Sequence, residues 1–288
     1  MPVFTRALAA LPMPPLQPLR LPGLADAAVL RLDLVDPLLS GNKPYKLQGY
    51  FEHAAAAGAK GLISLGGAHS NHLHALAAAG ARFGFASVGL LRGEPVDTPT
   101  VRDLQRFGMQ LHWLGYGGYR QRHQAGFWAP WLARYPGFEP VPEGGGGALG
   151  QRGCRVLVEQ ALAQLPALGW AHFDAWWLAA GTGTTALGIA AFDARPVYAA
   201  MAVPPGHGVE AAVAGTQVQR VEAARQGFGR FDDELLAFVA QCPLPVEPLY
   251  TGKALMALLA HPLREQRVLF VHTGGIRPPA EHPRAAPL

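Results

Sequence analysis

The chain has 288 residues, of which half are hydrophobic and 15% are charged. This composition supports a large buried core in one or two domains and excludes a mainly disordered protein. The net charge of +4 is mild and the arginines are scattered, which argues against a nucleic-acid partner. No apolar run approaches the roughly 20 residues that span a bilayer, so we expect no membrane partner.

The cysteines and the N-terminal residues indicate the cellular compartment in which we expect the protein. Cys154 and Cys242 are the only cysteines and lie far apart, too few for a disulfide framework or a zinc site. The stretch from Met1 to Leu24 is broken by prolines and lacks the apolar centre of a signal peptide. We therefore expect a protein of the reducing cytoplasm.

Short apolar runs alternate with alanine-rich helical stretches along the chain. In order, the pattern predicts a strand at 61–65, a helix at 70–83, a strand at 85–91, a helix at 98–107, and strands at 110–114 and 173–179. A turn at 181–185, a helix at 185–192 and strands at 197–203 and 267–272 follow. Continuous apolar strands alternating with helices are typical of parallel sheets covered on both faces, so the predicted fold class is α/β.

Three stretches carry a weaker pattern. Gly144 to Gly147 lies between the two halves and is a candidate crossing point between domains. The stretch from 204 to 229 predicts one amphipathic helix followed by Gly227-Phe228-Gly229. The end from Arg277 to Leu288 is rich in proline and alanine, and we expect it to be frayed.

The first segment that could carry chemistry runs from Ser40 to Leu47 and contains Lys43 followed by Pro44. Proline suits the first helical turn, so Lys43 is predicted at a loop-to-helix junction. Taken alone, such a lysine is most often a surface charge. The chain has only four lysines, at positions 43, 46, 60 and 253, whereas arginine is frequent.

The second segment, from Gly66 to His72, follows a predicted strand and opens a helix. Its backbone N–H groups and the helix dipole favour an anion such as a carboxylate. Ser70 is also suited to cap the helix, and both roles are compatible. His69, His72 and His74 are close in sequence, but His72 and His74 point to different helix faces and have no carboxylate or cysteine nearby, so no metal site is predicted.

The third segment, from Gly181 to Thr185, is a glycine-threonine turn between a strand and a helix. Glycines allow close backbone approach and threonine hydroxyls add donors, which together favour a phosphate. The same turn resembles a degenerate dinucleotide fingerprint, with Gly188 misplaced and no acidic residue about 20 positions further on. A nicotinamide-dependent oxidoreductase therefore stays open as an alternative.

Two further segments complete the set. Tyr250-Thr251-Gly252-Lys253 is the fourth, and the strand from Val268 to His272 with Thr273-Gly274-Gly275 is the fifth. The end of a buried strand followed by a Gly-Gly turn is a usual place for ligand contacts in an open sheet.

In this order and spacing, the segments resemble the 1-aminocyclopropane-1-carboxylate (ACC) deaminase/D-cysteine desulfhydrase family of pyridoxal-phosphate (PLP) enzymes, of the tryptophan-synthase-β-like fold type II. The family pattern G-N-K-x-x-K-L matches Gly41 to Leu47, and G-G-x-x-S-N follows with Ser70 placed 27 positions after Lys43. The resemblance extends from about residue 30 to 276.

The resemblance implies an architecture. It predicts two open, parallel-rich sheets flanked by helices, with PLP between a larger and a smaller domain. The larger domain would comprise residues 1–46 and 148–288, and the smaller one residues 47–147. It also implies a homodimer.

The resemblance further implies roles for single residues. Lys43 would form the Schiff base with PLP and shuttle the Cα proton, and Ser70 and Tyr250 are the other predicted catalytic residues. Asn71 would bond the PLP 3′-oxygen. Ser70, Asn71 and His72 would receive the substrate carboxylate. Gly181, Thr182, Gly183, Thr184 and Thr185 would hold the phosphate, and Thr251 would face the pyridine nitrogen beside the Tyr250 ring.

Two departures from the family pattern narrow the reaction. ACC deaminases have a glutamate where this chain has Thr251, and an active-site tyrosine where it has Phe228. A neutral partner for the ring nitrogen suits removal of the Cα proton and β-elimination from a small amino acid, with D-cysteine giving a 2-oxo acid, ammonia and sulfide. ACC ring opening and a catalytically silent PLP- or amino-acid-binding protein stay open as alternatives.

Overall fold

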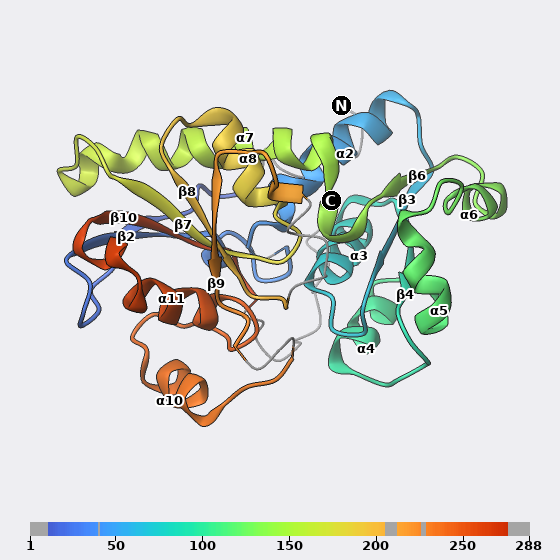
Figure 1. Cartoon of the computed structure of the whole chain (residues 1–288). Helices are drawn as coiled ribbons and strands as arrows, with labels where there is room; N and C mark the ends of the chain where they lie inside the picture. Colours follow the sequence, from blue (N-terminus) through green and yellow to red (C-terminus); the bar gives the residue numbers. More distant parts are fainter. Residues whose placement is uncertain (1–10, 40, 205–211, 226–228, 276–288) are drawn as a thin grey trace.

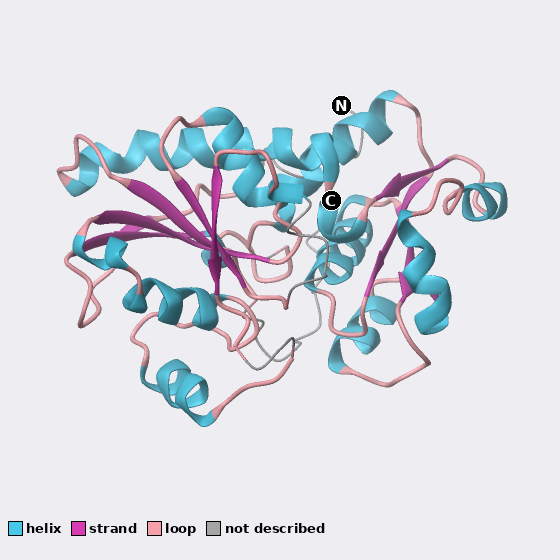
Figure 2. Cartoon of the chain, viewed as in Figure 1, coloured by secondary structure: helices cyan, strands magenta, loops and turns pink. Residues whose placement is uncertain are grey.

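The structure, a computed structural model, describes residues 11–39, 41–204, 212–225 and 229–275. Figure 1 shows two sheets side by side, each flanked by helices, and Figure 2 shows the same view by secondary structure. The α/β class and the two open, parallel-rich sheets predicted from the sequence are confirmed. The division into domains at 46/47 and 147/148 stays a prediction; both limits fall inside helices.

The larger sheet has the strand order β1-β2-β10-β7-β8-β9. Its strands are β1 (Leu16–Pro18), β2 (Asp26–Arg31), β7 (Ala175–Ala180), β8 (Val197–Met201), β9 (Val218–Glu222) and β10 (Arg267–His272). Only β1 pairs antiparallel among these strands, with β2, and the other pairs are parallel. The carboxyl ends of the parallel strands therefore lie at one edge, where open α/β sheets bind ligands.

Alternation along these strands divides the core between two faces. On β10, Leu269 and Val271 pack with the core that α7 (Gly147–Gln164) and α8 (Thr184–Phe192) complete. The neighbouring Val268 and Phe270 pack on the opposite face with α11 (Thr251–Ala260). Both faces are apolar, as expected for a parallel sheet covered on both sides, and α10 (Asp233–Gln241) lies outside α11.

The smaller sheet has the order β5-β4-β3-β6 and is parallel throughout. Its strands are β3 (Gly61–Gly66), β4 (Ala86–Leu91), β5 (Gln110–Trp113) and β6 (Phe138–Val141). Helices α2 (Lys43–Ala56), α3 (Asn71–Phe83) and α4 (Pro99–Arg106) contribute to the core on one face. Residues of α5 (Gly115–Arg120) and α6 (Ala129–Arg134) lie on the other (Figure 1).

Helices α2 and α7 cross in direct backbone contact. A Cβ atom at Gly153 would lie 1.8 Å from the Tyr45 carbonyl oxygen, and one at Gly49 would lie 2.5 Å from that of Leu149. Only glycine at both positions permits this approach, since no real Cβ contact is that short. The helix that begins at Lys43 is thus fixed against the helix that leads into the larger sheet.

The sequence predicted bounds for nine strands and helices, all within two residues of the observed ends, and those of β10 match at both ends. It did not predict the strands β1, β2, β6 and β9 or the helices α5, α6, α7, α10 and α11. A helix was predicted between 204 and 229. Residues 205–211 and 226–228 of this stretch lie outside the described residues, and the part that is described includes the strand β9. The predicted frayed end, from Arg277 onward, lies outside the described residues, as does Phe228.

Candidate active site

Lys43 is the first residue of α2, and a tight turn at Gly41 precedes it. Gly41 has a φ of +73°, and a Cβ there would lie 2.0 Å from the carbonyl oxygen of Thr273. The backbone N–H of Asn42 donates to that same oxygen at 3.2 Å. The loop that carries Lys43 therefore rests on the turn that follows β10, which joins the first and fifth sequence segments.

Asn42 connects Lys43 to the glycine-threonine turn. The Asn42 Nδ2 donates to the Thr185 Oγ1 at 2.8 Å in the buried interior. The Lys43 Nζ donates to the Asn42 Oδ1, and the lysine side chain is half-buried. The lysine and the predicted phosphate turn, 138 residues apart in the sequence to Gly181, are thus adjacent in space.

Lys46 is a second lysine in this region, and no role was predicted for it from the sequence. It is 4% exposed, and its Nζ donates to the Thr182 Oγ1 at 3.4 Å. Burial lowers the pKa of Lys46 to about 8. The spacing of Lys46 one helical turn after Lys43 was the available signal, since residues three apart share a helix face.

The glycine-threonine turn opens α8 beside Lys46. Gly183 is the residue before the helix, with a φ of +71°, and the Thr182 and Thr184 hydroxyls lie 3.0 Å apart. A Cβ at Gly144 would lie 2.8 Å from the Thr182 Cγ2 and 3.7 Å from the Lys46 Nζ. The glycines predicted as a crossing point therefore pack closely over the turn.

The segment from Gly66 to His72 joins β3 to α3 as predicted. Ser70 caps the helix, and its Oγ accepts from the Leu73 N–H at 3.2 Å. Asn71 is the first helical residue, and His69 is exposed. His74 faces away from this end, with its Nε2 3.5 Å from Asp103. Of the N–H groups in the first turn of α3, those of Asn71 and His72 make no hydrogen bond within the helix and can receive a carboxylate.

The His72 imidazole is buried and held in one tautomer. Its Nε2 lies 2.8 Å from the Ser64 Oγ, and that hydroxyl donates to the Val141 carbonyl at 2.7 Å. Since the serine proton is used, Nε2 must be the donor and Nδ1 carries a lone pair. Burial, with the charges of Lys46 and Lys43, lowers the pKa of His72 well below its ordinary value. The side chain cannot donate to a carboxylate, so that predicted role falls to the His72 backbone N–H.

Nδ1 of His72 is buried and makes no hydrogen bond to the part of the chain that the structure describes. The His72 Cε1 would lie 3.7 Å from a Cβ at Gly145, and that Cβ would also contact the Lys46 side chain. A buried acceptor of this kind needs a donor, which an ordered water or a bound group can supply.

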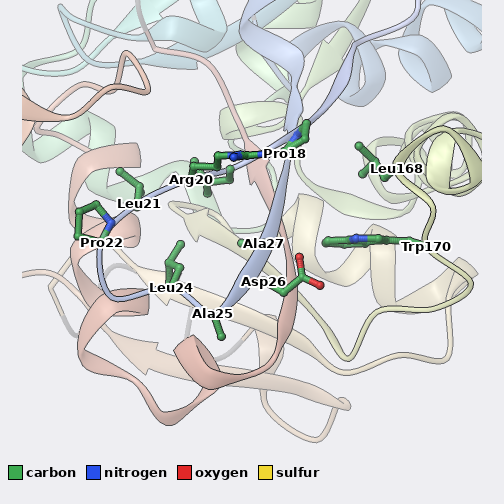
Figure 3. Close-up of a pocket in the computed structure, with 11 residues that line it drawn as sticks. Pro18, Arg20, Leu21, Pro22, Leu24, Ala25, Asp26, Ala27, Leu168 and Trp170 are labelled. Carbon is green, nitrogen blue, oxygen red and sulfur yellow. The ribbon is translucent and has the colours of Figure 1, made fainter.

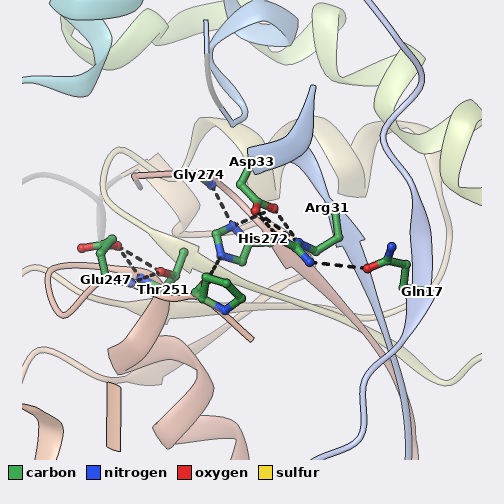
Figure 4. A network of polar contacts seen from close by, with 8 residues as sticks. Gln17, Arg31, Asp33, Glu247, Thr251, His272 and Gly274 are labelled. Atoms are coloured by element: carbon green, nitrogen blue, oxygen red, sulfur yellow. Dashed lines mark hydrogen bonds and ion pairs between the residues drawn. The ribbon is translucent and has the colours of Figure 1, made fainter. Parts of the chain in front are cut away.

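The fourth segment starts α11, and Glu247 holds it. The Thr251 N–H donates to the Glu247 Oε1 at 2.8 Å, and the Thr251 hydroxyl also donates to it at 3.2 Å. The Glu247 N–H donates to the Thr251 Oγ1 at 3.0 Å (Figure 4). The Thr251 hydroxyl thus already has a donor and an acceptor, and contact with a ring nitrogen requires it to exchange one. Sequence reasoning did not single out Glu247.

Tyr250 lies against the glycine-threonine turn. A Cβ at Gly181 would lie 3.2 Å from the Tyr250 Cε1. Burial raises the pKa of the Tyr250 phenol, and the nearby carboxylates of Glu247 and Glu143 raise it further. Tyr250 is therefore a neutral hydroxyl at the edge of the predicted phosphate site.

A separate pocket of about 590 Å³ lies beside β1 and β2 (Figure 3). It is lined by Asp26, Trp170 and residues of the turn between the two strands. None of the predicted site residues lines it. The pocket is therefore distinct from the region around Lys43.

The residues around Lys43 fit a phosphorylated aldehyde such as PLP. Lys46, which is buried beside the Thr182 and Thr184 hydroxyls, supplies a positive charge that a phosphate would pair. The N-terminus of α8 adds backbone N–H groups. Lys43 supplies an amine within the same region, as a Schiff base requires.

Comparisons with known proteins agree with this fit. No family model matches the chain. A Pyrococcus horikoshii protein, whose name assigns it provisionally as a 1-aminocyclopropane-1-carboxylate deaminase, is 27% identical over 88% of this chain and 85% of its own length. The mitochondrial bifunctional D-cysteine desulfhydrase/1-aminocyclopropane-1-carboxylate deaminase of Arabidopsis thaliana is 26% identical over 96% of this chain and 79% of its own length.

Solved structures share the fold. An ACC deaminase homologue superimposes with a TM-score of 0.74 at 23% identity, covering 96% of this chain and 95% of its own. A pyridoxal 5′-phosphate-dependent aspartate racemase superimposes with a TM-score of 0.67 at 12% identity, covering 95% and 94%. The resemblance predicted from the ordered motifs is confirmed: over most of its length this chain is similar to ACC deaminase/D-cysteine desulfhydrase proteins, and it has the fold type II architecture.

Proposed function

We propose that the protein is a PLP-dependent lyase that acts on a small amino acid, removing the Cα proton and expelling a β-substituent, with D-cysteine as the leading substrate. The observation that carries the proposal is the connection of Lys43 through Asn42 to Thr185, with Lys46 on Thr182 beside it. This connection supports an amine next to a proposed anion site, which a phosphorylated aldehyde needs.

The proposed phosphate site uses Lys46, the hydroxyls of Thr182 and Thr184, and the N-terminus of α8. The proposed carboxylate site uses the N–H groups at the start of α3, including those of Asn71 and His72. Both sites are helix N-termini, where the dipole and free N–H groups favour an anion. The substrate would then be held with its Cα between the two sheets.

Lys43 is the proposed base. When bound, PLP supplies an electron sink for the negative charge that develops at Cα. The Lys43 Nζ would take the Cα proton, and the electrons of the Cα–H bond would expel the β-substituent. In the net reaction, D-cysteine and water give pyruvate, hydrogen sulfide and ammonia.

Position 251 supports elimination over ring opening. Thr251 is fully buried and bonded to Glu247, so it offers a neutral group where the resemblance places the glutamate of ACC deaminases. A neutral partner leaves the ring nitrogen uncharged and the electron sink weaker. We propose that this sink suffices for an amino acid with a good leaving group such as a thiol.

A spectroscopic test comes first. Protein purified with PLP should show visible absorbance that shifts when borohydride reduces the lysine-bound cofactor, and Lys43→Ala should lose it. Lys46→Ala keeps the amine and should regain the absorbance at higher PLP concentration. Absence of the absorbance in the wild-type protein at saturating PLP refutes the proposal.

A substrate panel then separates the candidate reactions. Sulfide, 2-oxo acid and ammonia would be measured with D-cysteine, L-cysteine, other β-substituted amino acids and ACC. Sulfide and pyruvate from D-cysteine in equal amounts support the proposal. The visible absorbance without turnover of any compound indicates a binding protein, and turnover of ACC alone indicates ring opening.

We further propose a cytoplasmic homodimer. Among the helices that the structure describes, none is long and apolar enough to cross a membrane. Light scattering of the purified protein at micromolar concentration measures the mass, with twice 30.6 kDa as the expected result. A mass equal to one chain refutes the dimer.

A further inference from the structure

His272, the last residue of β10, contacts three segments of the chain from a fully buried position (Figure 4). Its Nε2 lies 2.7 Å from the carbonyl oxygen of Pro245. Its Nδ1 lies 3.3 Å from the backbone nitrogen of Gly274 and also 3.3 Å from the Asp33 Oδ1. One ring therefore joins β10 to the short helix η2 (Leu32–Leu34) and to the loop before α11.

Two of these contacts exclude each other. The Pro245 carbonyl only accepts, so Nε2 carries a hydrogen in either protonation state. The Gly274 N–H can donate to Nδ1 only when Nδ1 has its lone pair, which makes the ring neutral. Asp33 can accept from Nδ1 only when Nδ1 is protonated, which makes the ring an imidazolium. A neutral His272 thus bonds Gly274, and a charged one bonds Asp33.

The surroundings favour the neutral ring. Asp33 is already paired with Arg31, whose Nε lies 2.9 Å from Oδ1 and whose Nη2 lies 2.6 Å from Oδ2. Burial lowers the pKa of His272 below its ordinary value, Asp33 opposes this shift, and Arg31 adds to it. Asp33 on η2 and Arg31 on β2 are the charged groups that bear on the ring among the described residues; the Pro245 segment presents a carbonyl.

The turn that His272 holds is the one beneath Lys43. The Thr273 carbonyl accepts from the Asn42 N–H at 3.2 Å, and Gly41 packs directly on Thr273 and Gly274. The bond from Gly274 to His272 therefore fixes the surface on which the lysine loop rests. Losing it frees the turn to move away from Asn42.

We infer that His272 is a positioning residue: its neutral imidazole holds the Thr273–Gly274 turn against the loop of Lys43, and its protonation transfers Nδ1 to Asp33 and loosens that loop. The inference deepens the proposed function, because this loop carries the proposed cofactor lysine. It concerns contacts within the chain, so it can be tested without cofactor.

The first measurement is amide hydrogen exchange of the cofactor-free protein at Asn42 and Gly274 between pH 5 and 8, expressed as protection relative to the unfolded chain. Wild-type protection should fall on acidification. Asp33→Asn removes the negative charge that stabilises the charged ring, so the fall should shift to lower pH. Asp26→Asn, which removes the partner of Arg267 at the other end of β2, is the matched control and should leave the wild-type profile.

Substitutions of His272 separate its hydrogen bond with Gly274 from its hydrogen bond with Pro245. His272→Asn places an acceptor near the Nδ1 position and cannot titrate, so protection of Gly274 should persist at low pH. His272→Gln places its amide nearer the Pro245 carbonyl, and His272→Ala lacks both groups; in both, protection at Gly274 and Asn42 should be lost at every pH. Thermal unfolding of each variant identifies any that fails to fold.

NMR of the protein labelled with ¹⁵N-histidine gives the tautomer directly. The resonances lost in His272→Asn should belong to a neutral ring with hydrogen on Nε2 at pH 7. A ring with hydrogen on Nδ1 at pH 7, or protection that does not depend on pH, overturns the inference. The visible absorbance of bound PLP is recorded in parallel. If the absorbance is absent while protection follows the expected profile, the proposed function fails and the inference stands.

Discussion

Ser64 and His72 share a buried hydrogen bond of 2.8 Å in which the imidazole is the donor, because the serine proton goes to Val141. Ser64→Ala leaves a buried N–H without an acceptor. We expect it to lower the free energy of unfolding by about 1–3 kcal/mol. Urea unfolding measures the change, with Ser87→Ala, at another buried serine on the neighbouring strand, as the matched control. An equal loss in both variants contradicts the assigned tautomer.

The pKa of Lys46, near 8, predicts a pH dependence of phosphate binding. The folded protein releases the Lys46 proton near pH 8, whereas an exposed lysine keeps its proton until about pH 10. Affinity for a PLP analogue without the aldehyde, 4′-deoxypyridoxine 5′-phosphate, should therefore decline above pH 8 as the charge is lost. Calorimetric titration between pH 6.5 and 9.5 measures it.

Substitution of Lys46 measures how much its charge contributes to the affinity for the analogue. A charge-assisted hydrogen bond contributes about 1.5–3 kcal/mol, so Lys46→Ala should weaken binding of the analogue roughly 10- to 150-fold and remove the decline above pH 8. Lys60→Ala, at an exposed lysine, should leave both unchanged. Unaltered affinity in Lys46→Ala would show that the phosphate lies elsewhere.

Gly41 and Gly58 form a matched pair for the lysine loop. Both have positive φ, +73° and +63°, but a Cβ at Gly58 meets nothing within 4 Å, whereas one at Gly41 collides with Thr273. Gly58→Ala should cost about 1 kcal/mol of stability from the left-handed backbone alone. In Gly41→Ala the collision with Thr273 should lower the stability by about 1–3 kcal/mol more, and it should displace Lys43. Thermal unfolding and PLP binding measure the two effects, and similar behaviour of both variants would contradict the close packing.

The hydrogen bonds of the Thr251 hydroxyl predict how substitutions at this position change stability. Thr251→Ser keeps the bonds with Glu247 and should lower the free energy of unfolding by less than 1 kcal/mol. Thr251→Val keeps the shape but leaves the Glu247 N–H without its acceptor. This loss should lower the free energy of unfolding by about 1–3 kcal/mol. Guanidinium unfolding at pH 7 compares them. If Val is no worse than Ser, the hydroxyl does not hold the segment.

The elements that the sequence predicted best carry their own local signals. Ser70 and Thr98 cap α3 and α4, and both helices begin at the next residue. The run from Arg267 to His272 is apolar at every interior position, as a central parallel strand requires. Local composition and capping chemistry determine such boundaries, so a single sequence suffices to find them.

The site residues that the sequence missed depend on burial and on loop contacts that local patterns do not report. Lys46 is significant because it is buried against Thr182, 136 positions away, and no local pattern reports burial of a lysine. Glu247 matters because it accepts from the first N–H groups of α11 across a loop that contains Pro248. The β9 strand was missed because its exposed outer residues give no continuous apolar run.

The glycine contacts between α2 and α7 have a mechanical consequence. Because the two backbones touch at Gly153 and at Gly49, the helices leave no layer of side chains along which they could slide. A displacement of α2 would carry α7 with it, and α7 packs on α8, the helix that begins at the glycine-threonine turn. Lys43, Lys46 and that turn therefore move as one unit.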